Sequence, residues 1–227
     1  MTADPKTRLR ADARRNRDHI LAAAREMFAA QGLDIPMEEI ARAAGVGVGT
    51  LYRRFPDRDS LILAVAQEAF TQVIDDARAA AAEEPTGWAA LERLIGRSRG
   101  LQVSFQLAWS SARARDILLA DPNTGRLRDA LMAELARIVA AAQAEGTMRP
   151  DVGAGDIAVL LVLLLRQPPV GRGPMRFGLD RAVAIMLDGL RASSTNPLPG
   201  DPISDADLPF DGEHAAAMSR LRSSRDR

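Results

Sequence analysis

Apolar residues recur every three or four positions along most of the chain, and this spacing predicts amphipathic helices. The first predicted helix covers residues 16–31, and its apolar stripe consists of Ile20, Leu21, Ala24, Met27 and Phe28. Further helices are predicted over residues 38–44, 48–55, 57–84, 88–99, 101–119, 127–145, 156–165 and 177–192. Alanine is abundant and aromatic residues make up only 4% of the chain, which also favours helix over sheet. The sequence therefore predicts an all-α fold.

A glycine-rich corner, Gly45-Val46-Gly47, separates the second and third predicted helices. Gly45 can adopt the positive φ that a tight helix end requires. In the third helix Leu51 and Phe55 lie one turn apart and are predicted to point inward. The other side of that helix carries Thr50, Tyr52, Arg53 and Arg54. An exposed helix face of this composition, on a helix-turn-helix, suits the major groove of DNA.

Two segments together resemble one known family: N-R-D-H-I-L-A-A-A-R-E-M-F-A-A-Q-G-L, from Asn16, and E-E-I-A-R-A-A-G-V-G-V-G-T-L-Y-R-R-F-P-D-R-D-S-L, from Glu38. They resemble the TetR-type (tetracycline-repressor-like) bacterial transcriptional regulators. Two positions depart from the family's pattern. Pro36 stands where a Thr often opens the second helix, and Arg58 stands where a Lys contacts phosphate. Arginine keeps the charge of lysine but has a different hydrogen-bonding geometry.

The predicted DNA-contacting residues are Gly47, Val48, Gly49, Thr50, Tyr52, Arg53, Arg54 and Arg58. Arg53 and Arg54 are the candidates for reading base edges, because arginine donates two hydrogen bonds to guanine, although one of them could bind phosphate only. Tyr52 is predicted to contact phosphate through its hydroxyl, with packing of its ring as the alternative. Arg58 is predicted to bind phosphate near the start of the following helix.

The remaining predicted contacts each have an alternative interpretation. Thr50 suits either a phosphate or a thymine methyl group. Gly47 and Gly49 either let the backbone approach the groove closely or only shape the turn. Val48 is ambiguous between the protein core and the groove.

The second part of the chain contains no recognisable catalytic constellation: no G-x-S-x-G, no phosphate-binding loop and no histidine beside a nucleophile. We expect it to bind a small, mostly apolar ligand between helices rather than to catalyse a reaction. The candidate pocket residues are Phe70, Trp88, Gln102, Phe105, Gln106, Trp109 and Met132. Residues of these types are more often found in ordinary core positions, and that is the alternative for each of them.

Composition limits the remaining possibilities. The formal net charge is zero, so contact with nucleic acid must come from a local basic patch. There is no cysteine and there are two histidines, so neither a metal site nor a cofactor is expected. The N-terminus has no apolar segment of the signal-peptide kind, and the longest apolar run, Ile157 to Leu165, is about half of a membrane span. We therefore expect a cytoplasmic protein with no membrane contact.

The sequence predicts four regions. Residues 1–15 are read as a flexible basic arm, either solvated or lying along the DNA backbone or in a minor groove. Residues 16–73 form the predicted helix-turn-helix domain, and residues 74–192 a helical ligand-binding and dimerisation domain. Residues 193–227 are rich in Pro, Gly and Asp and are predicted to be a disordered tail.

The resemblance implies the mechanism. The long helix over residues 57–84 joins the DNA-binding part to the body and acts as a lever. The last two helices, residues 156–192, pair with their copies in a homodimer that binds a near-palindromic operator. A ligand then releases the repressor from its double-stranded DNA. The alternatives are a regulator of this type without a small-molecule ligand, controlled by a protein partner, or an activator.

Overall fold

The computed structural model describes residues 5–96, 112–165, 176–193 and 196–203. Over these ranges the chain is helical, with a single isolated bridge between Met148 and Arg191, so the predicted all-α fold is confirmed. The helices are α1 (Pro5–Gln31), α2 (Met37–Ala43), α3 (Val48–Arg54), α4 (Arg58–Glu83), α5 (Gly87–Gly96), α7 (Ala112–Ala120), α8 (Pro122–Ala144), α9 (Ala154–Leu165) and α10 (Arg176–Gly189). Among the described helices, none combines the length and the apolarity that crossing a membrane requires.

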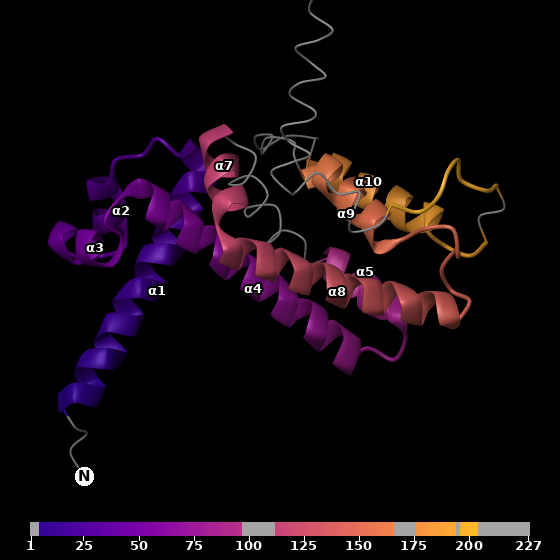
Figure 1. Ribbon diagram of the computed structural model, residues 1–227, viewed down its shortest axis with the longest axis horizontal. Coiled ribbons are helices and arrows are strands. Elements are labelled where there is room, and N and C mark those ends of the chain that lie inside the picture. Colours follow the sequence, from indigo (N-terminus) through magenta and orange to yellow (C-terminus); the bar gives the residue numbers. More distant parts are fainter. Residues whose placement is uncertain (1–4, 97–111, 166–175, 194–195, 204–227) are drawn as a thin grey trace, which may run out of the picture.

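The first four helices form a head at one end of the molecule (Figure 1). Its core buries Ile20 and Leu21 from α1, Ile40 from α2 and Leu51 from α3, each with no exposed surface. Gly45 has a φ of +66° and ends α2 as its sequence predicts. These contacts fix α3 against α1 and α2, so the orientation of its outer face is set by the head core.

A second core holds the body together, and α4 belongs to both. Leu61 and Val65 of α4 lie in the head core, whereas Val73 and Ala77 of the same helix lie in the body core. In the body α4 runs beside α5 and α8 (Figure 1). Asp57 caps the start of α4, because its carboxylate accepts a hydrogen bond from the Ser60 amide at 2.7 Å. This hydrogen bond also lowers the pKa of the Asp57 carboxyl.

Helix α7 connects the body back to the head. Ala114 is fully buried in the head core. Its neighbour Arg113 donates two hydrogen bonds to the carboxylate of Asp59 in the first turn of α4, at 3.1 and 2.8 Å. The head is therefore held by α7 as well as by the continuous helix α4.

The structure corrects the predicted arm and the predicted start of one later helix. Residues 5–15 are helical, since α1 begins at Pro5 rather than near Asn16. Proline is favoured in the first helical turn, and Ala, Leu and Arg are good helix formers. In the same way α8 begins at Pro122, with Asp121 as its cap, whereas the sequence predicted a start at residue 127. The Asp121 carboxylate accepts from the Thr124 amide at 2.7 Å.

The predicted disordered tail is also wrong over part of its length. Residues 196–203 lie against the body, and we call them the strap. The Asp151 carboxylate accepts from the Leu198 amide at 3.0 Å, and Arg149 donates to the Asn196 carbonyl at 2.7 Å. Gly155 allows this contact, because a Cβ at that position would lie 2.3 Å from the Ile203 carbonyl oxygen. Residues 204–227 lie outside the described part of the chain.

Candidate nucleic-acid interface

The outer face of α3 is open to solvent. Val48 and Tyr52 are each 40% exposed, whereas Leu51 between them has no exposed surface. The structure therefore places Val48, which was ambiguous from sequence, on the surface. Gly47 and Gly49 are exposed, have no positive φ, and would meet no closer atom than 3.9 Å if given a Cβ. Since the described part of the chain does not itself require glycine at these two positions, close approach to DNA remains the prediction for them.

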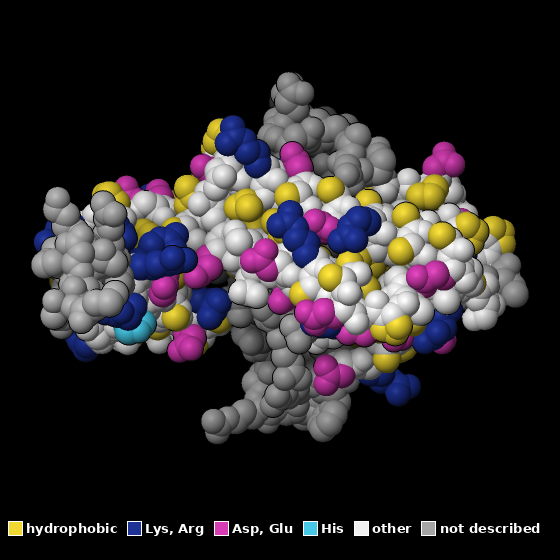
Figure 2. All heavy atoms as spheres, turned by 90° about the horizontal axis from the view of Figure 1, so that it is seen from below, with side chains coloured by type: hydrophobic (Ala, Val, Ile, Leu, Met, Phe, Trp, Pro, Cys, Tyr) yellow, Lys and Arg dark blue, Asp and Glu magenta, His cyan; other side chains and the backbone are white. Residues whose placement is uncertain are grey.

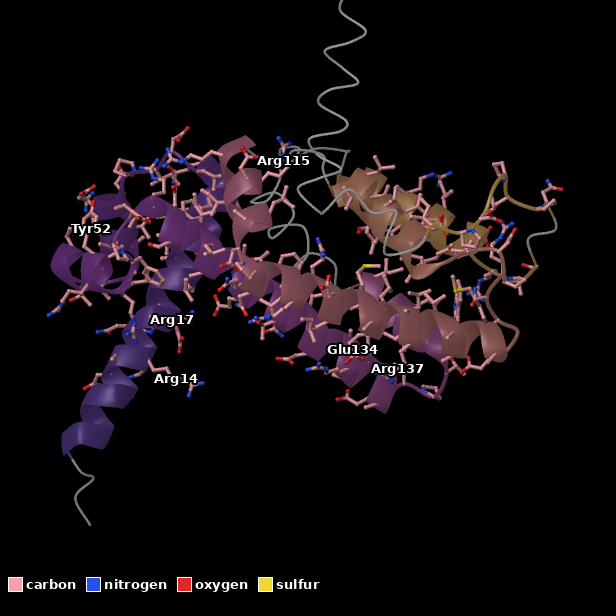
Figure 3. The ribbon with its side chains drawn as sticks, in the orientation of Figure 1. Arg14, Arg17, Tyr52, Arg115, Glu134 and Arg137 are labelled. Carbon is pink, nitrogen blue, oxygen red and sulfur yellow. The ribbon has the colours of Figure 1, made fainter. Side chains whose placement is uncertain are left out.

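Two side-chain hydrogen bonds involve residues on the outer face of α3. The Tyr52 hydroxyl donates to a Glu38 carboxylate oxygen at 3.2 Å, and Arg53 Nη2 lies 3.2 Å from the Thr50 hydroxyl. Partial desolvation, followed by the nearby Glu38 carboxylate, raises the pKa of Tyr52. The phenol therefore stays protonated at neutral pH and can donate to a phosphate oxygen. Figure 3 labels Tyr52 at the edge of the head.

The other two predicted arginines make contacts that the sequence did not reveal. Arg54 Nη2 donates to the Ala13 carbonyl of α1 at 3.3 Å. Arg58 Nη1 lies 3.5 Å from the Asp34 carboxylate. Both are exposed or partly exposed contacts, which contribute little to stability and leave the guanidinium groups able to exchange partners. The partner atoms are 41 and 24 residues distant in sequence, so no local spacing pattern could have indicated them.

Basic side chains lie on this end of the molecule. Figure 2 shows Lys and Arg side chains on the head, at the left of the view, and others on the body, where hydrophobic side chains are also exposed. Because the whole chain has no net charge, a local excess of arginine near α3 is what would attract the DNA backbone. Within the described residues, no cluster of His, Asp or Glu is suited to binding a metal ion.

The structure describes only three of the predicted pocket residues: Phe70, Trp88 and Met132. Gln102, Phe105, Gln106 and Trp109 lie outside the described residues. Trp88 and Met132 are both 6% exposed and belong to the same body core, and Phe70 is half-buried. Trp88 Nε1 is buried without a hydrogen-bond partner within the described structure, and the Arg191 guanidinium lies 4.6 Å from the centre of the Trp88 ring. This buried donor is the feature of the predicted pocket that an ordinary core position does not explain.

Comparison with known proteins identifies the family. Residues 20–65 match the profile of "Bacterial regulatory proteins, tetR family", and residues 106–192 match "Transcriptional regulator SbtR-like, C-terminal domain". A TetR transcription regulatory protein from Mycobacterium vanbaalenii, whose crystal structure is known, is 37% identical with a TM-score of 0.61. That similarity covers 81% of this chain and 99% of the other. The chain belongs to the TetR family.

Other relatives of this TetR-family chain agree with that assignment. A TetR transcriptional regulator from Streptomyces coelicolor is 32% identical with a TM-score of 0.63, covering 78% of this chain and 99% of the other. Curated HTH-type transcriptional regulators from Staphylococcus aureus are 38% identical over 76 residues. That match spans 41% of their length and 30% of this TetR-family chain. The likeness to the curated relatives therefore covers only a minority of either chain.

Proposed function

We propose that the protein is a cytoplasmic, dimeric repressor that binds a near-palindromic operator and is released from it by a small, mostly apolar ligand. It acts by binding and not by catalysis. The observation that carries this proposal is the exposed outer face of α3, which presents Tyr52 and Arg53 while Leu51 anchors the helix in the head core. One such helix reads too few base pairs to be selective, so a two-fold pair is required.

The exposed apolar face of α9 and α10 supports the dimer. Leu160, Leu163 and Ile185 are 37%, 56% and 63% exposed, which is unusual for adjacent large aliphatic side chains. They line a groove of about 650 Å³ between the two helices and the strap. The two charged residues in that groove are satisfied within the chain: Asp156 accepts from the Gly153 amide at 2.7 Å, and Arg149 pairs with Asp151. An apolar face of this kind suits a second copy of the chain, in a four-helix contact through residues 156–192.

The buried N–H of Trp88 supports a ligand in the body. An unpaired buried donor costs free energy until an acceptor reaches it. A ligand carbonyl or hydroxyl beside Trp88 would supply that acceptor, and the surrounding core, including Met132, would take the apolar part of the ligand. A ligand shifts the balance between DNA-binding and released forms only by its difference in affinity for the two.

The DNA-binding part is tested by a mobility shift across a salt series, using DNA upstream of the protein's own gene and of its divergent neighbour. We expect sequence-selective binding that Arg53→Ala weakens by about 1–3 kcal/mol, the value of one good base contact. Arg137→Ala is the matched control, because Arg137 lies on α8 in the body (Figure 3) and pairs with Glu134 at 2.8 Å. Weak, salt-sensitive binding that is equal for all three proteins would refute the proposed role of α3.

A ligand screen by thermal shift separates the proposal from a regulator controlled by a protein partner. A compound that binds the folded body stabilises it and so raises the melting temperature. At a ligand concentration a hundred times the dissociation constant, the free energy of unfolding increases by about 2.7 kcal/mol. We expect Trp88→Phe, which removes the N–H and keeps most of the ring, to weaken that shift. A broad metabolite set that leaves the melting temperature unchanged would favour the partner-controlled alternative.

A further inference from the structure

The strap is fixed to the body although it buries little of its own surface. Seven of its eight residues are exposed, and only Ile203 is half-buried. Backbone hydrogen bonds at Asn196 and Leu198 fix one end, and at the other end the Ile203 amide donates to the Asp156 carboxylate at 3.3 Å. Figure 1 shows the strap in yellow, at the end of the body farthest from the head. Ordering a segment costs conformational entropy, and burial of its own side chains offsets little of that cost here.

The anchor of the strap is a buried ion pair. Arg149 is only 7% exposed. It donates to both oxygens of the Asp151 carboxylate at 2.6 and 2.8 Å, to the Gly189 carbonyl at 3.3 Å and to the Asn196 carbonyl at 2.7 Å. The hydrogen bonds from Arg149 and from the Leu198 amide hold the pKa of the Asp151 carboxyl far below its usual range. A buried charge is tolerated when it is paired and hydrogen-bonded in this way, so the anchor stays charged and fixes the position of the strap at neutral pH.

The strap presents one large apolar side chain to the solvent. Leu198 is 44% exposed and stands between Pro197 and Pro199. Proline has a fixed φ, and it also disfavours a helical backbone at the residue before it. Leu198 is therefore carried on a stiff, anchored backbone. Such a side chain loses less conformational freedom on binding than one on a flexible chain, which favours association.

Leu198 lies in the same groove as the exposed apolar residues of α9 and α10. The groove is lined by Leu163 and Ile185 on the side of the two helices, and by Leu198 and Ile203 on the side of the strap. Among the described residues that line it, the charged ones are paired within the chain, as shown above. The apolar surface of the strap is therefore continuous with the face of α9 and α10 that we propose to meet a second copy.

We propose that the strap, through Leu198, forms part of the contact between two copies of this chain. The inference rests on the proposed dimer and extends its interface from residues 156–192 to residues 196–203. A second copy is the partner that fits, because the groove is apolar and continuous with the proposed dimer face. A two-fold contact uses the same patch on both copies, so each Leu198 side chain contributes once from each side. The strap thus adds to the strength of a dimer that α9 and α10 form.

The test removes the apolar side chain and leaves the anchor intact. Leu198→Ala keeps the backbone amide that binds Asp151. We expect the dissociation constant of the dimer to rise about tenfold, since two leucine side chains lose apolar burial. Sedimentation velocity over a dilution series measures it. Leu198→Met, which conserves volume, should restore most of the affinity. Asn196→Ala is the matched control, because its exposed side chain belongs to the strap but does not line the groove.

Each other outcome overturns the inference. Leu198→Ala could dimerise as the wild type does, or Asn196→Ala could weaken the dimer equally. A lower melting temperature for Leu198→Ala, at unchanged dimerisation, would assign this side chain to a contact within its own chain. The proposed dimer fails separately: the wild type would stay monomeric at all concentrations, or aspartate at both Leu163 and Ile185 would leave it dimeric. Loss of the dimer in that double variant, with normal dimerisation of Leu198→Ala, would refute the role of the strap alone.

Discussion

Replacing both Leu163 and Ile185 by aspartate should convert the protein to a monomer and remove selective operator binding. Among the large apolar residues of α9 and α10 whose exposure the structure describes, these two are the most exposed, at 56% and 63%. In a two-fold interface each substitution appears twice, so four carboxylates would have to be buried close to one another. Specific binding typically exceeds non-specific binding by about 10³–10⁷, and we expect a loss of at least about 10³ in operator affinity. Sedimentation equilibrium and an operator titration measure the two effects.

The control for this prediction adds a carboxylate elsewhere on the body. Ala136 is exposed on α8, and Ala136→Asp should leave both mass and operator affinity unchanged. If the double variant remains dimeric with normal affinity, then the apolar face of α9 and α10 is not where two copies meet.

Leu51→Ala should unfold the head far more readily than any change on the outer face of α3. Leu51 has no exposed surface and contributes to the head core together with Phe28 and Ile40. Truncating a fully buried leucine costs about 2–5 kcal/mol, because the lost contacts leave a cavity. Denaturant unfolding followed by circular dichroism measures the change, and operator binding should be lost in proportion to the unfolded fraction.

Arg53→Ala, two residues further on, is the matched comparison. Its side chain is exposed, so unfolding should be almost unchanged while operator affinity falls. Comparing Leu51→Ala with Arg53→Ala distinguishes the role of the buried face of this seven-residue helix, which is stability, from that of its exposed face, which is DNA binding. Equal stability of the two variants would mean that α3 is not anchored through Leu51.

The helix-turn-helix could be predicted from sequence because its signals are local. The spacing of Leu51 and Phe55 and the positive φ at Gly45 each depend on residues within a few positions, and both appear in the structure. The exposure of residues predicted to contact DNA could be predicted in the same way: Tyr52 is exposed because its neighbour Leu51 faces the core. Their contacts with DNA itself stay predictions.

The errors come from segments whose structure depends on distant partners or on competing signals. The strap has the composition of a disordered chain, but Arg149, Asp151 and Asp156 supply hydrogen bonds to its backbone from more than forty residues away. The start of α1 is rich in charge, which suggested a flexible arm. Its helix-forming residues and Pro5 were the signal that pointed the other way.

The length of α4 has a consequence for how little movement regulation would need. Its 26 residues give a helix of about 39 Å, with the head at one end and the body core along the rest. A tilt of about 5° about one end displaces the other by about 3.4 Å, which is the rise of one base pair along a DNA strand. In a dimer the two recognition helices must fit two half-sites at a fixed separation. A tilt of α4 by only about 5° would therefore shift a recognition helix relative to its half-site by a whole base-pair step.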